Sequence, residues 1–160
     1  MTKTDKQFKK HFNNVRQFHF LFGHPVNMPW RQFVKERYQL RQVLLNEELK
    51  EFETATGENN KAEMLDALVD ASYIALGTLV EIKATNSPDC YWMQFECMDA
   101  YRASRHVAES KGWDFNKAWE IVHHANMSKV GEDGKVHYRE DGKVLKPKGW
   151  TPPNLEHLVA

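Results

Sequence analysis

Acidic side chains occur on two expected helices at positions where an apolar residue would normally lie. The first of these two helices is expected over approximately residues 29–56, and its apolar stripe is formed by Leu40, Val43 and Leu44. At 100° per residue, Glu47 and Glu51 continue this stripe and Glu48 borders it. The sequence therefore predicts that this helix directs carboxylates toward the interior.

The next expected helix repeats the arrangement. Glu63, Asp66 and Asp70 lie on the same helical face as Ala67, Ile74 and Gly77. No basic residue lies three or four positions from Asp66 or Asp70, so pairing within the helix does not explain them. Two helices are thus expected to bring carboxylates together.

Such a cluster requires positive charge nearby. Two carboxylates about 6 Å apart repel by about 3 kcal/mol at an effective dielectric of about 20, so five or six cannot all ionise unaided. Oxygen ligands favour a hard cation, and Mg²⁺ combines carboxylates with water and phosphate oxygens. The chemistry indicated is hydrolysis of a phosphoryl or nucleotidyl group.

A third polar interruption occurs on the last long expected helix. Its apolar stripe consists of Phe115, Ala118, Trp119 and Val122. Asn126 and Lys129 continue this stripe, and an amide with an ammonium group could hold phosphate oxygens. The alternative is a cap residue and a lysine that is favoured by the helix dipole.

Glycine, proline and asparagine divide the chain into helices. The expected helices cover approximately residues 5–22, 29–56, 60–84, 87–111 and 115–128. Asn60, Ser87 and Asp114 are the expected N-terminal caps. The segment at 60–84 is apolar on nearly all sides and should be the most buried helix. We expect an all-α fold, a bundle of four or five helices forming one domain over residues 1–160, with an irregular or hairpin tail in which 135–146 could pair.

Composition limits the function classes. The 22 basic and 22 acidic residues balance, so the basic field that favours nucleic acid or anionic membranes is missing. No apolar run reaches the length of a membrane span, and residues 1–11 have no apolar signal region. Cys90 and Cys97 would lie about 10 Å apart on one helix, too far for a disulfide. We expect a reduced, cytoplasmic location with no nucleic-acid or membrane partner.

These motifs together resemble the all-α, MazG-type nucleoside triphosphate pyrophosphohydrolases. Residues 47–51 have the form EExxE, residues 63–66 have the form ExxD, and Asp70 and Gly77-Thr78 follow in order. The segments at 18–25, 125–129 and 141–147 are similar to a small phage and bacterial branch. The resemblance covers about residues 15–153.

The resemblance implies hydrolysis of a (deoxy)nucleoside triphosphate between the α and β phosphates, which releases the monophosphate and pyrophosphate and controls a deoxynucleotide pool. It implies two or three Mg²⁺ ions, with Mn²⁺ as an alternative, held by Glu47, Glu48, Glu51, Glu63 and Asp66. Asp70 would support the metals, and either Glu47 or Glu48 would activate water. The phosphates would be held by Asn126, Lys129, Lys143 and Lys146. The resemblance also implies that the protein forms a homodimer or homotetramer. If the chain is phage-encoded, its location would be the host cytoplasm.

Two features depart from the family pattern. Only eleven residues, 52–62, separate the two acidic motifs, which is short for the family, and a further segment is added after them. Residues 82–111 resemble a helical insertion, because relatives pass more directly between the flanking helices. Its aromatic residues are Tyr91, Trp92, Phe95 and Tyr101. They could line a base pocket or a subunit interface, although such spacing is more typical of core packing.

Three alternatives remain. A di-iron carboxylate bundle needs two Glu-x-x-His motifs, and only Glu120 with His123 supplies one. A non-enzymatic helical module that binds a partner would leave the acids merely solvated. Within the enzyme class, the resemblance also includes phosphoribosyl-ATP pyrophosphohydrolases.

Overall fold

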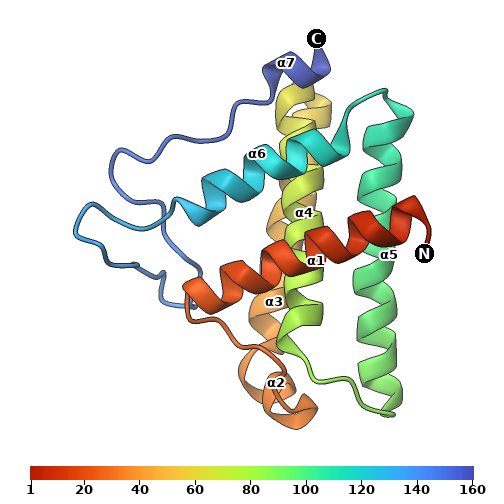
Figure 1. Ribbon diagram of the computed structural model, residues 1–160, viewed down its shortest axis with the longest axis vertical. Coiled ribbons are helices and arrows are strands. Elements are labelled where there is room, and N and C mark those ends of the chain that lie inside the picture. Colours follow the sequence, from red (N-terminus) through yellow and green to blue (C-terminus); the bar gives the residue numbers. More distant parts are fainter.

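The computed structural model describes residues 1–160 and is built from helices. Three long helices, α3 (Tyr38–Gly57), α4 (Lys61–Glu81) and α5 (Pro88–Ser110), stand side by side, and α1 (Lys3–Leu21) and α6 (Phe115–Met127) cross over them (Figure 1). Short helices α2 (Trp30–Glu36) and α7 (Glu156–Val159) lie at opposite ends. The predicted all-α bundle is confirmed.

Side-chain caps fix several helix starts. Asn60 Oδ1 accepts a hydrogen bond from the Glu63 N–H at 3.2 Å, and Asp114 Oδ1 accepts from the Lys117 N–H at 3.0 Å, as predicted. Thr2 and Asp5 form a capping box, which begins α1 earlier than the sequence pattern indicated. Ser87 precedes Pro88 at the start of α5, but its side chain makes no capping hydrogen bond.

The single helix predicted over residues 29–56 is wrong, because the chain breaks at Arg37. This residue has φ −126° and ψ −27°, outside helical geometry. Its guanidinium donates two hydrogen bonds to Glu81, at 2.7 and 3.0 Å. A tertiary ion pair at the junction therefore accompanies the separation of α2 from α3, with no proline or glycine at the break.

The inward face of α3 also differs from the prediction. The apolar stripe places Val43 inside, but this residue is 41% exposed. The buried positions of α3 are Arg41, Leu44, Glu48 and Ala55. The helix is thus turned so that a basic and an acidic side chain take interior positions.

Helix α4 forms the centre of the fold, as its apolar composition predicted. Of its 21 residues, 14 are buried. The main core packs around it and includes Phe22, Leu65, Leu76 and Trp119. None of the helices combines the length and apolar character that a membrane crossing requires.

Helix α5 occupies the segment interpreted as an insertion. Cys90, Met93 and Cys97 face a smaller apolar cluster, and both cysteines are free thiols. Of its aromatic residues, Tyr101 is buried, whereas Tyr91, Trp92 (62% exposed) and Phe95 are on the surface. The packing prediction is therefore confirmed for Tyr101 and wrong for the other three, which point away from the bundle.

The tail after α6 runs along one side of the bundle before it reaches α7 (Figure 1). It contains one antiparallel bridge, between Tyr138 and Val144, within the region predicted to form a hairpin. The Tyr138 hydroxyl donates to the Phe22 carbonyl at 2.7 Å, and the Trp150 indole N–H donates to the Ala125 carbonyl at 2.9 Å. These bonds attach the tail to the ends of α1 and α6.

Candidate functional site

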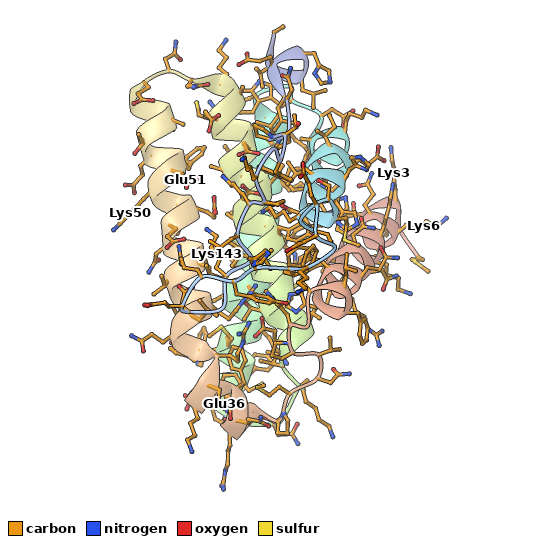
Figure 2. The ribbon with its side chains drawn as sticks, turned by 90° about the vertical axis from the view of Figure 1, so that its left-hand side faces the viewer. Lys3, Lys6, Glu36, Lys50, Glu51 and Lys143 are labelled. Atoms are coloured by element: carbon orange, nitrogen blue, oxygen red, sulfur yellow. The ribbon has the colours of Figure 1, made fainter.

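A cavity of about 580 Å³ lies between α3, α4, α6, the end of α1 with the loop after it, and the tail. Figure 2 shows this side of the molecule, with Glu51 on α3 and Lys143 on the crossing tail. Nine of the ten residues predicted for the site line the cavity: Glu48, Glu51, Glu63, Asp66, Asp70, Asn126, Lys129, Lys143 and Lys146. The structure therefore gathers side chains from four separate segments of the chain.

The carboxylates within the cavity lack partners and crowd one another. Glu48 is 6% exposed, and its Oε2 has no hydrogen-bond partner; Asp66 Oδ1 is likewise buried and unpartnered. Burial, and then Glu51, raise the pKa of Glu48 to about 8. Burial, and then Asp70, raise the pKa of Asp66 to about 8. Burial, and then Glu48, raise the pKa of Asp70 to about 7.

This donor set suits a hard cation. Unpartnered buried carboxylate oxygens are costly unless a positive group compensates them. Glu48 and Asp66 both carry such oxygens, and the cavity lining adds further carboxylates but no sulfur donor. The carboxylate cluster offers only oxygen ligands, and such a set is typical of Mg²⁺ or Mn²⁺ rather than zinc.

Glu47 is the one predicted site residue that does not line the cavity. Its Oε1 accepts a hydrogen bond from Arg139 at 3.1 Å, and its Oε2 accepts from Lys143 at 3.2 Å. In this structure Glu47 therefore connects α3 to the tail, while its neighbour Glu48 faces the cavity.

Basic and amide groups occupy the cavity wall formed by α6 and the tail. Burial lowers the pKa of Lys129, although the nearby Asp70 carboxylate opposes that change. Asn126 is buried one turn before it. The Nζ atoms of Lys129 and Lys146 lie 5.2 and 5.5 Å from the centre of the Trp150 ring. The tryptophan thus holds two ammonium groups at the cavity rim by cation–π attraction.

The inner end of the cavity contains side chains that sequence reasoning did not select. Arg41 is buried; its Nε donates to Thr78 Oγ1 at 3.0 Å, and its guanidinium also donates to the Ile74 carbonyl at 2.7 Å. His24 lines the same end, and neither of its ring nitrogens has a partner. Apolar periodicity does not identify a buried arginine such as Arg41. That the His24 ring has no hydrogen-bond partner can be recognised only from the structure.

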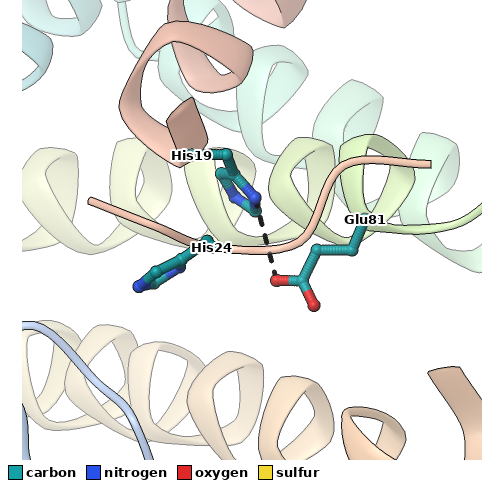
Figure 3. Close-up of side chains that lie close together, drawn as sticks. All are labelled: His19, His24 and Glu81. Atoms are coloured by element: carbon teal, nitrogen blue, oxygen red, sulfur yellow. Dashed lines mark ion pairs between the residues drawn. The ribbon is translucent and has the colours of Figure 1, made fainter. Parts of the chain in front are cut away.

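His19, His24 and Glu81 form a second group of possible metal ligands (Figure 3). Their ligand atoms lie within 4.8 Å of one another. Glu81 already contacts Arg37 at 2.7 Å and Arg41 at 3.1 Å. Two guanidinium groups around one carboxylate leave this group positive overall, which disfavours a metal cation. Burial would raise the pKa of Glu81, but Arg41 and Arg37 outweigh it and hold that pKa low.

The di-iron alternative finds no support in the geometry. Glu120 is on the surface, where it pairs with Lys10 at 3.0 Å and Lys117 at 3.7 Å. His123 Nδ1 is hydrogen-bonded to the Tyr73 hydroxyl at 2.9 Å. Neither residue lines the carboxylate cavity.

Comparison with known proteins agrees with the cavity chemistry. Residues 15–85 match the family model of phosphoribosyl-ATP pyrophosphohydrolase. These residues, which are less than half of the chain, are therefore similar to a family of nucleotide pyrophosphohydrolases. The matched segment includes every carboxylate from Glu47 to Asp70, whereas Asn126 and the three lysines lie beyond it.

Two individual proteins are also similar. "Uncharacterized protein L479" of Acanthamoeba polyphaga mimivirus is 32% identical over 78 residues, which is 46% of this chain and 31% of that protein. The chain therefore matches less than a third of the length of its viral relative. A crystal structure from Exiguobacterium sp. 255-15, described as a "putative NTP pyrophosphohydrolase", has 26% identity and a TM-score of 0.49 over 89% of this chain and 88% of that one.

Proposed function

We propose that this protein hydrolyses a (deoxy)nucleoside triphosphate between its α and β phosphates and releases the monophosphate and pyrophosphate. The observation that carries the proposal is a single cavity with carboxylates on one wall and ammonium groups on the other. A triphosphate with bound cations is complementary to both walls, because the acids can hold the cations and the lysines can hold the phosphates.

The carboxylates of Glu48, Glu51, Glu63 and Asp66 would hold two or three Mg²⁺ ions, with Asp70 supporting them. Glu47 would join this set after leaving its present partners, Arg139 and Lys143. The ions would supply charge neutralisation for the phosphates and lower the pKa of bound water.

The side chains of the other wall would position the phosphates. Asn126 would donate its amide N–H, and Lys129, Lys143 and Lys146 would donate ammonium N–H groups to phosphate oxygens. Of the two glutamates considered for activating water, Glu48 is the better placed, because it lies in the cavity with one oxygen unpartnered. It would orient the water for in-line attack on the α phosphorus and accept its proton, and pyrophosphate would leave.

A second candidate substrate is phosphoribosyl-ATP, which the description of the matching family favours. The segments at 18–25 and 125–129 resemble the triphosphate-hydrolysing branch instead. Assays with phosphoribosyl-ATP and with the common deoxynucleoside triphosphates, run side by side, distinguish the two. We also propose that the protein forms a homodimer or homotetramer and acts on a deoxynucleotide pool.

The central test measures pyrophosphate release in the presence of Mg²⁺. We expect Glu48→Gln or Asp66→Asn to lower the rate by about 100-fold or more, since each removes a carboxylate charge from the cavity. Glu53→Gln is the matched control, because Glu53 is an exposed residue of α3 outside the cavity. Full activity in both cavity variants would contradict the proposed site, and no hydrolysis of any nucleotide would contradict the proposed function.

A further inference from the structure

The inner end of the cavity presents hydrogen-bonding groups whose partners are missing. Both ring nitrogens of His24 are buried within it and have no hydrogen-bond partner. An unpaired buried polar group is energetically unfavourable, so a group held in this state inside a cavity favours a ligand that pairs with it.

Arg41 lines the same cavity and has N–H groups to which no acceptor is assigned. A guanidinium has five N–H groups, and in Arg41 three of them are accounted for by Thr78, Ile74 and Glu81. These bonds fix the orientation of the side chain, which is buried but lines the cavity. The remaining donors are therefore preorganised for an acceptor.

The spacing along α3 matches the length of a nucleotide. Arg41, Leu44 and Glu48 line the cavity in succession. At 1.5 Å per residue, Arg41 and Glu48 are separated by about 10 Å along the helix. If the phosphates lie beside Glu48, as proposed above, Leu44 is level with the sugar and Arg41 with the base.

Aromatic rings complete this end of the cavity. Phe18 and Tyr73 line it, with ring centres 5.5 Å apart, and the His24 ring is 5.7 Å from Phe18. A flat heterocycle can pack against such rings. Figure 3 shows His24 on the segment that follows α1, beside His19 and Glu81.

We propose, on the basis of the proposed function, that Arg41 and His24 select the nucleobase and favour one with an exocyclic oxygen beside a ring nitrogen over adenine. The oxygen would accept from Arg41, and the adjacent ring nitrogen would pair with His24. Cytosine, thymine, uracil and guanine all have this edge. Adenine would place its amino donor against the guanidinium donors.

The protonation state of His24 agrees with this pairing. Burial, and then Arg41, lower the pKa of His24 to about 4, so the ring is neutral near pH 7. A neutral imidazole offers one donor and one acceptor. It can thus serve either a ring N–H, as in thymine and guanine, or a ring nitrogen lone pair, as in cytosine.

The experiment compares kcat/KM for the common deoxynucleoside triphosphates in the presence of Mg²⁺. We expect the best oxygen-bearing base to exceed dATP by about 100-fold. His24→Phe keeps a ring but removes both nitrogens and should reduce this ratio to below about tenfold, whereas His24→Gln retains a donor and an acceptor and should restore most of it. His124→Phe, at an exposed position of α6, is the control and should leave the ratio unchanged.

A second measurement does not require catalysis. Deoxycytidine, thymidine, deoxyguanosine and deoxyadenosine are titrated against the full chain, and the ring nitrogen resonances of His24 are followed by NMR. We expect the first three to shift these resonances at lower concentration than deoxyadenosine. If the nucleosides show this order but no triphosphate is hydrolysed, the base selection holds and the proposed function falls. If dATP is hydrolysed as well as the others, or the ratio is unchanged in His24→Phe, the base selection is overturned while the proposed function stands.

Discussion

Gly77 lies on α4 opposite the buried Arg41 guanidinium, where a side chain would not fit. A Cβ atom at this position would lie 2.5 Å from Arg41 Nη2 and 2.9 Å from His19 Nε2. Arg41 cannot withdraw without losing its bonds to Thr78, Ile74 or Glu81. The absence of a side chain at Gly77 therefore allows Arg41 to occupy its buried position at the inner end of the cavity.

We predict that Gly77→Ala lowers the free energy of unfolding by about 1–3 kcal/mol, because it overpacks a rigid buried network. Gly57→Ala is the control: Gly57 is also helical, and nothing lies within 4 Å of its Cβ position, so that variant should be neutral or slightly more stable. Urea denaturation of the three proteins measures the difference. Equal urea midpoints for Gly77→Ala and the parent protein would show that the buried groups around Arg41 accommodate the methyl group without loss of stability.

The sequence indicated the acidic half of the site but not its inner end. Asp66 and Asp70 stood out because they interrupt an apolar helix without a basic partner at helical spacing. Arg41 and Glu81 gave no such signal, since a charged residue on an amphipathic helix is ordinarily assigned to the solvated face. Their pairing joins positions 40 residues apart, and only the fold brings them together.

For the helices, the sequence predicts features that depend on neighbouring residues and does not predict features that depend on contacts between distant residues. The caps at Asn60 and Asp114 are local hydrogen bonds, so the starts of α4 and α6 could be predicted. The break at Arg37 coincides with a contact to Glu81. The orientation of α3, in which Val43 is exposed, coincides with the burial of Arg41. Neither has a signature within its own segment.

The tail hairpin and α3 are joined by a small group of ion pairs. Arg139 contacts both Glu47, at 3.1 Å, and Asp141, at 2.6 Å, and Lys143 contacts Glu47 at 3.2 Å. The paired side chains are about a third exposed, so solvent screening limits their contribution to about 1 kcal/mol or less.

We therefore predict that Arg139→Ala increases amide hydrogen exchange in residues 137–145 by up to about fivefold, because the hairpin opens more often. Glu47→Gln should have a similar effect, since it removes the charge to which both cations bind. Glu48→Gln serves as the comparison, because Glu48 faces the cavity and makes no contact with Arg139. Exchange measured by mass spectrometry tests this; identical exchange in all variants would mean that these pairs do not hold the tail.

For the whole molecule, the acid cluster sets how stability depends on pH and on divalent cations. The pKa values of Glu48 and Asp66 rise to about 8 and that of Asp70 to about 7 in the folded chain, from ordinary values of 4.5 and 3.8. At pH values between the ordinary and the raised pKa values, the folded chain binds more protons than the unfolded chain. The free energy of unfolding must therefore fall as the pH rises through this range. Cations that bind the ionised cluster should reverse this cost.

We predict that, in the presence of EDTA, the midpoint of thermal unfolding decreases as the pH is raised from about 5 to about 8, because the carboxyl groups lose protons while buried together. Saturating Mg²⁺ should raise the midpoint, and the increase should be larger at about pH 8 than at about pH 5, since only ionised carboxylates bind the metal well. The double variant Glu48→Gln, Asp66→Asn should weaken both dependences, because an amide does not titrate and is a poorer ligand for Mg²⁺. A parent protein whose midpoint in EDTA is constant or rises over this range would show that the carboxylates do not share protons in the folded state, and the electrostatic basis of the metal site would fail.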